Sequence, residues 1–385
     1  MAQRQLLRAI NRASILNAIK AHGAIARTDI ATFTGLSPAT VTGLTAELIE
    51  DGLILEKTEG ESRGGRRPIL LALNPQGAAV VGIKLAEEHA TLALTDINAD
   101  ILAKHTIQLG PRDPRSISLQ LASETRDLLA EAAIKTNQLL GVGVGLSGII
   151  DSQAGICRVS PHNDWHDVPF ANLLADELGC IVTLDNNVNT LTLVEQLYGA
   201  GQQVRDFLVI TTGRGVGMGI VTNGAIYRGS TGGAGEFGHI VIDPDGFACS
   251  CGNRGCLETF VSEPWLMRRA ELNGLHVTSP DDLIALAYAD HPIARDMLMA
   301  AGRALGQATA NLVNLFNPSL IIISGEGVRA GDLMFGTMRA TMARHMFAPL
   351  AEKLDIRIEP LSEDIWARGA ASLVLSTIFS MPTLH

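Results

Sequence analysis

Residues 235–258 read GEFGHIVIDPDGFACSCGNRGCLE, and the interpretation of the whole chain starts from this stretch. One histidine and three cysteines follow the spacing H-x9-C-x-C-x4-C, at positions His239, Cys249, Cys251 and Cys256. One imidazole and three thiolates match a tetrahedral zinc site in which protein ligands fill every position. A site with no open position for water is structural rather than hydrolytic. The alternative is a reduced cysteine cluster beside a core histidine.

The rest of the composition indicates a protein of two or three domains. The chain has 385 residues, 46% of them hydrophobic and 18% charged, as in ordinary soluble α/β proteins. The start, MAQRQLLRAINRA, has no continuous apolar segment, and no run of 18 apolar residues occurs anywhere. We therefore expect no signal peptide, no membrane insertion and a cytoplasmic location, where clustered cysteines favour metal over disulfides.

Charge is distributed unevenly along the chain. The net charge of the whole protein is −10, which by itself disfavours nucleic acid as a partner. Residues 1–76, however, hold nine Lys/Arg and seven Asp/Glu, a net +2, whereas the remainder holds 21 basic and 33 acidic residues, a net −12. A bias of +2 can also arise by chance, so the charge only indicates where a nucleic-acid binder would lie.

The N-terminal segment has the pattern of a helix-turn-helix. Residues 3–22 carry apolar side chains at helical spacing, and a short second helix capped by Thr28 follows, ending in a tight turn at Gly35. Ser37 suits the N-cap of a third helix that runs to about Asp51. Small polar residues at the start of this third helix point away from its apolar side and are predicted to contact DNA. They are Ser37, Thr40 and Thr42.

A β-hairpin, or wing, follows the third helix. Two apolar segments, 53–55 and 69–73, flank a polar stretch whose tip reads SRGGRRP at 62–68. Its arginines, Arg63, Arg66 and Arg67, suit phosphate or minor-groove contacts, although the tip could also be a solvated turn. The adjoining helix-turn-helix favours DNA. We place the DNA-binding domain at 1–76 and expect NPQG, residues 74–77, to be the linker.

The second domain, 77–385, is predicted to be α/β. Short apolar segments predict strands at 80–85, 90–96, 141–146, 180–184, 207–211 and 320–324, and helical patterns occupy 115–136 and 262–316. Strands that alternate with helices and end in glycines are typical of α/β architecture. Two such blocks, roughly 78–190 and 190–385, predict two lobes with a cleft between them.

Several motifs resemble the ROK family, which comprises repressors, uncharacterised reading frames and sugar kinases. Residues 235–258 look like the family signature, and the wing ending GRRP at 65–68 is similar to that of the family's repressors. LSGIID at 146–151 resembles an early strand-turn of the family, and SPHNDW at 160–165 resembles its sugar-side loop. The resemblance covers essentially the whole chain. It implies a two-lobed actin-like, ribonuclease H-like domain of the sugar-kinase type behind a winged helix-turn-helix.

The resemblance also implies a sugar site. Carboxylates, amides and an imidazole can serve both the donors and the acceptors of a polyol, and buried polar groups discriminate strongly against a missing hydroxyl. Zinc would hold this shell in place, because His239 belongs to both sites. The alternative is that the two carboxylates lie on the surface. The residues implied to face a monosaccharide are Asn163, Asn186, Glu236, His239 and Glu258.

The chain lacks two of the three parts that the family's kinases need. Residues 84–88 read KLAEE where the resemblance implies a phosphate loop like D-x-G-G-T. Residues 186–189 read NNVN in place of N-D-x-N, and the amide of Asn187 cannot act as the general base. A glycine-rich loop survives at 213–217 but is interrupted by Arg214. The chain keeps the residues that the resemblance implies for sugar binding and lacks two parts needed for phosphoryl transfer. We therefore expect a sensor and no enzyme.

These observations predict a repressor of carbohydrate-metabolism genes that a monosaccharide releases from operator DNA. A helix-turn-helix reads two half-sites, so a homodimer or homotetramer is expected. Two alternatives stay open. One is a residual sugar kinase, and the other is a regulator of this family whose effector is a protein.

Overall fold

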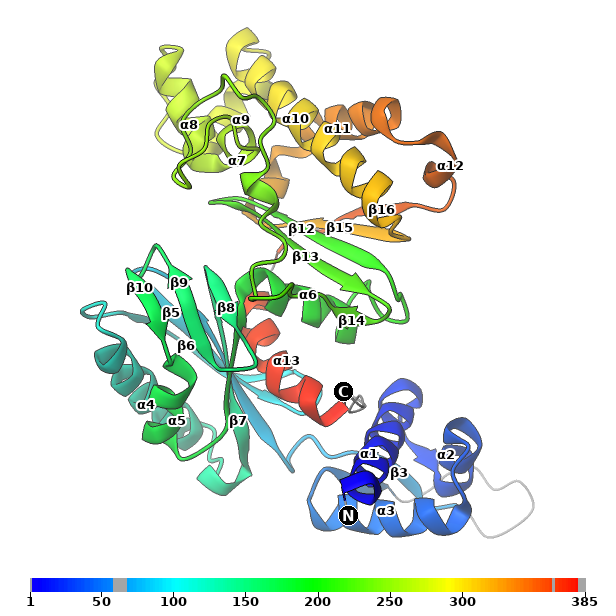
Figure 1. The fold of residues 1–385 in the computed structure, drawn as a ribbon. Helices are drawn as coiled ribbons and strands as arrows, with labels where there is room; N and C mark the ends of the chain where they lie inside the picture. The colour runs from blue at the N-terminus through cyan, green and yellow to red at the C-terminus, as the bar shows by residue number, and fades with distance from the viewer. Residues whose placement is uncertain (1, 58–67, 362–363, 380–385) are drawn as a thin grey trace. The chain divides into compact units, whose positions relative to one another are not determined.

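The structure is a computed structural model that describes residues 2–57, 68–361 and 364–379. It contains two compact units, one formed by Met1–Thr190 with Trp366–His385 and the other by Leu191–Ile365 (Figure 1). The sequence predicted that residues 190–385 form one block. The C-terminal helix belongs instead to the first unit, a return of the chain that hydrophobic periodicity does not reveal. Within the described residues, no helix is both long and apolar enough to cross a membrane.

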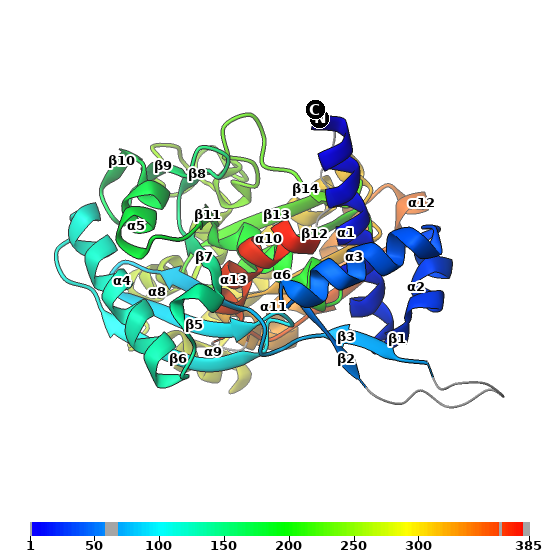
Figure 2. The ribbon, with the colours of Figure 1, turned by 90° about the horizontal axis from the view of Figure 1, so that it is seen from below.

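The N-terminal part of the first unit is the predicted winged helix-turn-helix, with strand order β1-β3-β2 (Figure 2). The apolar side of its third helix is buried, as the periodicity predicted. One detail was wrong, because Ala26 and not Thr28 stands at the N-cap of the second helix. The elements are α1 (Ala2–His22), β1 (Ile25–Ala26), α2 (Arg27–Thr34), α3 (Pro38–Glu50), β2 (Ile54–Lys57) and β3 (Leu70–Leu73).

The remainder of the first unit is built on a mixed sheet of order β11-β7-β4-β5-β6, in which β7 is parallel to both β4 and β11. A small antiparallel sheet of order β10-β9-β8 follows β7 in the chain. The strands are β4 (Ala79–Leu85), β5 (His89–Asp96), β6 (Ile101–Gln108), β7 (Leu139–Leu146), β8 (Ile149–Asp151), β9 (Ile156–Ser160), β10 (Trp165–Val168) and β11 (Val182–Asn186). The helices are α4 (Pro114–Glu131), α5 (Phe170–Leu178), the start of α6 (Asn187–Tyr198) and α13 (Ile365–Phe379).

Helix α13 packs closely against glycines on β4 and β7, and Figure 1 shows the helix beside this sheet. A Cβ on Gly82 would overlap the carbonyl oxygen of Ala367, and one on Gly143 would overlap that of Ala370. The other end of α13 contacts α1, where the Asn17 amide donates a 2.7 Å hydrogen bond to the carbonyl of Phe379. The helix therefore joins the centre of the sheet to the winged helix.

The second unit contains a sheet of order β14-β13-β12-β15-β16, with long helices that share its core. Strands β12, β15 and β16 run parallel, which places their carboxyl ends at one edge. The strands are β12 (Phe207–Thr212), β13 (Val216–Thr222), β14 (Ala225–Ile226), β15 (Leu320–Ser324) and β16 (Asp355–Ile358). The helices are α7 (Glu258–Val261), α8 (Glu263–Leu272), α9 (Pro280–Tyr288), α10 (Pro292–Phe316), α11 (Gly331–His345) and α12 (Ala348–Ala351).

Candidate functional site

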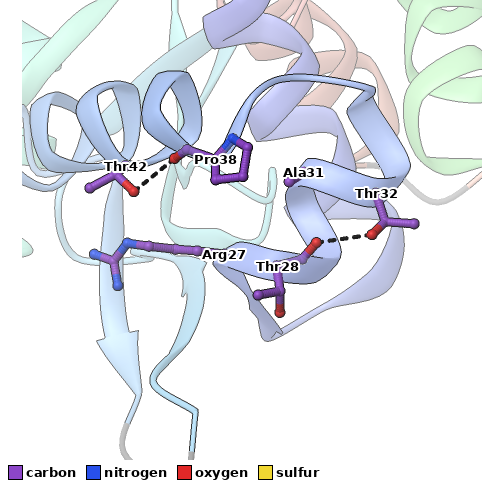
Figure 3. A pocket seen from close by; sticks show the side chains of 6 residues that line it. All are labelled: Arg27, Thr28, Ala31, Thr32, Pro38 and Thr42. Atoms are coloured by element: carbon purple, nitrogen blue, oxygen red, sulfur yellow. Dashed lines mark hydrogen bonds between the residues drawn. The ribbon is translucent and has the colours of Figure 1, made fainter.

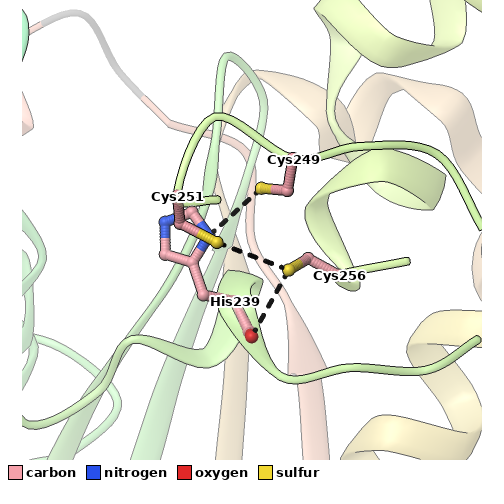
Figure 4. A group of neighbouring side chains, drawn as sticks. All are labelled: His239, Cys249, Cys251 and Cys256. Atoms are coloured by element: carbon pink, nitrogen blue, oxygen red, sulfur yellow. Dashed lines mark hydrogen bonds between the residues drawn. The ribbon is translucent and has the colours of Figure 1, made fainter. Parts of the chain in front are cut away.

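The four predicted metal ligands converge on one point (Figure 4). The ligand atoms of His239, Cys249, Cys251 and Cys256 all lie within 4.8 Å of one another. The Cys249 Sγ is 3.5 Å from His239 Nδ1, and the Cys251 Sγ is 3.6 Å from the Cys256 Sγ. A tetrahedron with metal–sulfur bonds of about 2.3 Å has edges of about 3.8 Å, so these separations match a coordination shell.

The backbone of the Cys/His loop, residues 235–258, holds these ligands together. The N–H of Cys249 donates to the carbonyl of Asn253 at 2.7 Å, and the N–H of Leu257 donates to Ile240 at 2.9 Å. Gly255 has a φ of +64°, and a Cβ there would overlap the carbonyl of Asp243. Only glycine permits both this conformation and this close approach, so Gly255 fixes the turn that carries the ligands.

The thiols of the cluster differ in their environments. Burial raises the pKa of Cys256 to about 12, because it removes water from the thiolate. The pKa of Cys251, which is exposed, is lowered, chiefly by the backbone N–H of Asn253. Metals bind the thiolate form, so a divalent ion would displace these protons when it binds.

Two predicted sugar-site carboxylates lie close to the cluster. His239 turns Nδ1 towards Cys249, and its Nε2 lies 3.8 Å from the carboxylate of Glu236. The Glu258 carboxylate accepts a 3.3 Å hydrogen bond from the N–H of Val216, and it faces Gly238, the residue before His239. Partial burial and Glu258 raise the pKa of Glu236. The second unit therefore brings Glu236, His239 and Glu258 around one turn, as the sequence suggested.

The other two predicted sugar residues belong to the first unit and differ from each other. Asn163 is 3% exposed, and its Nδ2 donates to Ser160 Oγ at 3.0 Å. Its Oδ1 is buried and has no hydrogen-bond partner among the described residues. Buried polar atoms are nearly always paired, so this oxygen points to a missing donor.

Asn186, in contrast, is engaged on both sides of its amide. Its Nδ2 donates to the carbonyl of Gly148 at 2.8 Å, and its Oδ1 accepts from the N–H of Val188 at 2.8 Å. These bonds hold the turn after β7 against the end of β11. Asp185 was not singled out from the sequence, yet it is fully buried and accepts from the Asn189 side chain at 2.8 Å. Its position at the end of a strand, before NNVN, was the available signal.

The residues that replace the kinase parts are engaged in structural contacts. The Asn187 amide accepts from the N–H of Val188 at 2.9 Å and donates to Ser147 Oγ at 3.3 Å. At the end of β4, the Lys84 ammonium lies 4.9 Å from the ring centre of Trp366 on α13. Glu87 forms a 2.7 Å ion pair with Arg112. An amide and a lysine–tryptophan contact stand where the resemblance implies a base and a phosphate loop.

The structure describes part of the side of the helix-turn-helix that the sequence predicted to face DNA. The Ser37 hydroxyl accepts from the N–H of Thr40 at 3.1 Å, which confirms the predicted N-cap, and Ser37 and Thr42 are exposed. Thr40 is half-buried, and the Thr42 hydroxyl donates to the carbonyl of Pro38 at 2.8 Å (Figure 3). The three wing arginines, Arg63, Arg66 and Arg67, lie outside the described residues.

Sequence reasoning missed Arg27, the first residue of α2. Its Nε donates to Thr45 on α3 at 3.1 Å, and its Nη2 pairs with Glu56 on β2 at 2.9 Å. Arg27 thus ties the recognition helix to the base of the wing. It also lines an open cavity between α2 and α3 (Figure 3). The other lining residues are Thr28, Ala31, Thr32, Pro38 and Thr42.

Comparison with protein families identifies both parts of the chain. Residues 80–377 match the model of the ROK family, which is more than half of the chain. The chain belongs to the ROK family. Residues 8–54 match a winged helix-turn-helix DNA-binding model, and the described elements agree with both assignments.

Individual ROK proteins resemble the whole chain or a large part of it. A putative xylose repressor of Caldicellulosiruptor sp. (strain Rt8B.4) is 32% identical, with 99% of each chain covered. The crystal structure of a ROK family transcriptional regulator, a homologue of the Escherichia coli MLC protein, superposes with a TM-score of 0.87 at 27% identity, covering 97% of this chain and 98% of that one. A ROK hexokinase from Thermus thermophilus is also 27% identical, with a TM-score of 0.67. It covers 76% of this chain and 96% of its own.

Proposed function

We propose that this ROK protein is a transcriptional repressor of carbohydrate-metabolism genes and that a monosaccharide releases it from operator DNA. One observation carries the proposal. A winged helix-turn-helix is joined to a sugar-kinase-type domain, and Asn187 and residues 84–88 stand where the resemblance implies the transfer machinery. The similarity to a putative xylose repressor along 99% of both chains supports the same conclusion.

The proposed effector is a monosaccharide bound by Asn163, Asn186, Glu236, His239 and Glu258. The unpaired Oδ1 of Asn163 supports this role, because a sugar hydroxyl would supply the donor that it lacks. Asn186 would act partly by holding the turn after β7. Zinc at the Cys/His loop would fix His239, and the nearby Glu236 carboxylate would orient the imidazole. When bound, the ion supplies structural support and no chemical step.

Binding of DNA is assigned to Ser37, Thr40 and Thr42 on α3 and to Arg63, Arg66 and Arg67 in the wing. A repressor that reads two half-sites works as a homodimer or homotetramer. The sugar would bind one conformation of the ROK domain more tightly than another and so favour it. We propose that the favoured conformation binds the operator less tightly.

Thermal shift with a panel of aldoses and amino sugars, including xylose and N-acetylglucosamine, tests the effector. We expect one sugar to raise the melting temperature, because a ligand that binds only the folded state stabilises it. The same samples with ATP and magnesium should show no sugar-dependent ATP consumption. Turnover of ATP that Asn187→Ala abolishes would contradict the proposal.

A further inference from the structure

The second unit carries two glycine-rich loops at the carboxyl ends of adjacent parallel strands. β12 ends at Thr212 and continues into residues 213–215, while β15 ends at Ser324 and continues into residues 325–327. The two strands pair in parallel register up to Thr211 and Ser324. Ligands of open α/β sheets bind at this edge, and glycines there allow phosphate to approach the backbone.

A buried hydroxyl lies where the two loops, 213–215 and 325–327, meet and form a glycine cradle. Thr212 is 1% exposed, and its Oγ1 has no hydrogen-bond partner among the residues that the structure describes. A Cβ on Gly327 would lie 2.8 Å from that oxygen, so the second loop lies directly against the first. An unpaired buried hydroxyl is costly, so the arrangement around Thr212 needs a physical explanation.

A carboxylate now lies in this cradle. A Cβ on Gly213 would overlap Oε2 of Glu326, the middle residue of the second loop. Glu326 therefore covers the backbone of the first loop, at the place where only a glycine leaves room for an incoming oxygen. Its own side chain is exposed to solvent.

Other charged groups lie at the same edge. Arg329, three residues further on, pairs with Glu263 at 2.7 Å and with Asp281 at 2.8 Å. Three carboxylates thus share this edge with that guanidinium. The pKa of Glu263 is raised, mainly by burial, and Glu326 contributes to the shift. Phosphate oxygens at this edge would meet negative charge at close range.

We propose that Glu326 excludes polyphosphates, and hence nucleoside di- and triphosphates, from the second unit. The ROK domain then answers to its sugar alone, whatever the nucleotide concentration. This inference rests on the proposed function, because a kinase would need the same cradle to hold its phosphate donor. It adds a specific residue, distinct from the missing base and phosphate loop of the first unit.

The test is calorimetric titration of the full chain with inorganic tripolyphosphate and with ATP, each with magnesium. Glu326→Gln removes the charge at nearly constant size, and Glu326→Gly also restores the open backbone. We expect no saturable binding to the wild type, and at least tenfold tighter binding of tripolyphosphate to both variants. Glu352→Gln, at an exposed acid beyond the end of α12, is the matched control and should behave as the wild type.

Circular dichroism, metal content and operator binding of each variant report whether the fold is intact. Tripolyphosphate or ATP binding by the wild type at the affinity of the variants would overturn the inference, and so would intact variants that bind neither probe. Failure of the proposed function would look different, as sugar-dependent ATP consumption. Neither variant should acquire that activity, because Asn187 is unchanged.

Discussion

Each of the two units contains a different stabilising feature. In the first unit, α13 packs so closely on the central strands that Gly82 and Gly143 have no room for a methyl group. In the second unit, the Cys/His loop depends on four side chains that converge where a metal ion fits. We expect the first unit to depend on this steric fit, and the Cys/His loop of the second unit to depend on deprotonated ligands that hold a metal ion. They should therefore respond differently to substitution, to chelators and to acid.

Loss of one thiolate should have the largest effect. Cys251 is exposed, so Cys251→Ser removes a ligand without leaving a cavity. We expect the variant to lose its zinc and the second unit to lose on the order of 5 kcal/mol of unfolding free energy, with a melting temperature roughly 10 °C lower. Elemental analysis and calorimetry measure both.

Cys180→Ser is the matched control, because this half-buried cysteine belongs to the first unit and lies outside the cluster. It should retain one zinc per chain and the wild-type melting temperature. Wild-type protein that contains no metal, and that a chelator does not destabilise, would show that the Cys/His loop folds without an ion.

A methyl group at one of the glycines that pack against α13 should have the next largest effect. Gly143→Ala places a Cβ against the carbonyl oxygen of Ala370, so either α13 or β7 must move. We expect a loss of about 3 kcal/mol in the first unit, with zinc content unchanged. Denaturant unfolding followed by hydrogen exchange assigns the loss to a unit.

Gly110→Ala is the control for that substitution, since the nearest atom to its Cβ would be 3.9 Å away. Its stability should stay within about 0.5 kcal/mol of the wild type. If Gly143→Ala is equally neutral, α13 is not tightly held and steric fit does not account for the first unit.

Substitutions in the wing should weaken DNA binding and leave the stability of both units unchanged. Replacing Arg66 and Arg67 with alanine removes two cations that we assign to phosphate or minor-groove contacts. Operator affinity should fall about tenfold, and the slope of log affinity against log salt should decrease by about two. Fluorescence anisotropy at several salt concentrations measures both. An unchanged slope would mean that the wing arginines do not meet DNA.

Acidification should change the stability of the two units in opposite directions. This is the smallest of the expected effects. His105 lies between Glu124 and Glu131, with its Nε2 2.8 Å from Glu131, and these carboxylates raise its pKa, Glu131 first. The folded-state pKa therefore exceeds the unfolded value. The stabilisation is complete below the unfolded pKa of about 6.5 and is lost as the pH rises through the folded value.

Between pH 8 and pH 6, the first unit should thus gain less than about 1 kcal/mol, because Glu131 is largely exposed. The second unit should weaken over the same range, since protons compete with zinc for thiolates. Hydrogen exchange in each unit follows both trends. His105→Gln should abolish the first trend and leave the second. A first unit that loses stability on acidification would contradict the assignment.

Local patterns in the sequence were sufficient to predict much of this molecule. The Ser37 cap, the buried side of α3 and the convergence of the four metal ligands depend on residues close together in the chain. Spacing and residue type therefore carry the information. The carboxylate that lies beside His239 was also predictable, because Glu236 precedes it by one turn of chain.

Contacts between distant segments were beyond local patterns. The return of α13 to the first unit depends on Gly82 and Gly143, which lie within apolar strands. The sequence does not show which segment packs against them. The same holds for Arg27, whose partners Thr45 and Glu56 lie 18 and 29 residues away. Asn186 was predicted as a sugar ligand by resemblance, yet only the structure shows that its amide already holds the turn after β7.

The central claim is that a sugar-binding domain without transfer chemistry controls a DNA-binding domain. Operator affinity of the wild type and of Glu258→Ala, measured with and without the sugar that thermal shift identifies, tests it most directly. We predict that the sugar weakens operator binding by the wild type roughly 5–150-fold, and that Glu258→Ala binds the operator normally but no longer responds. Undiminished operator affinity of the wild type at saturating sugar, or an unaltered response in Glu258→Ala, would contradict the account.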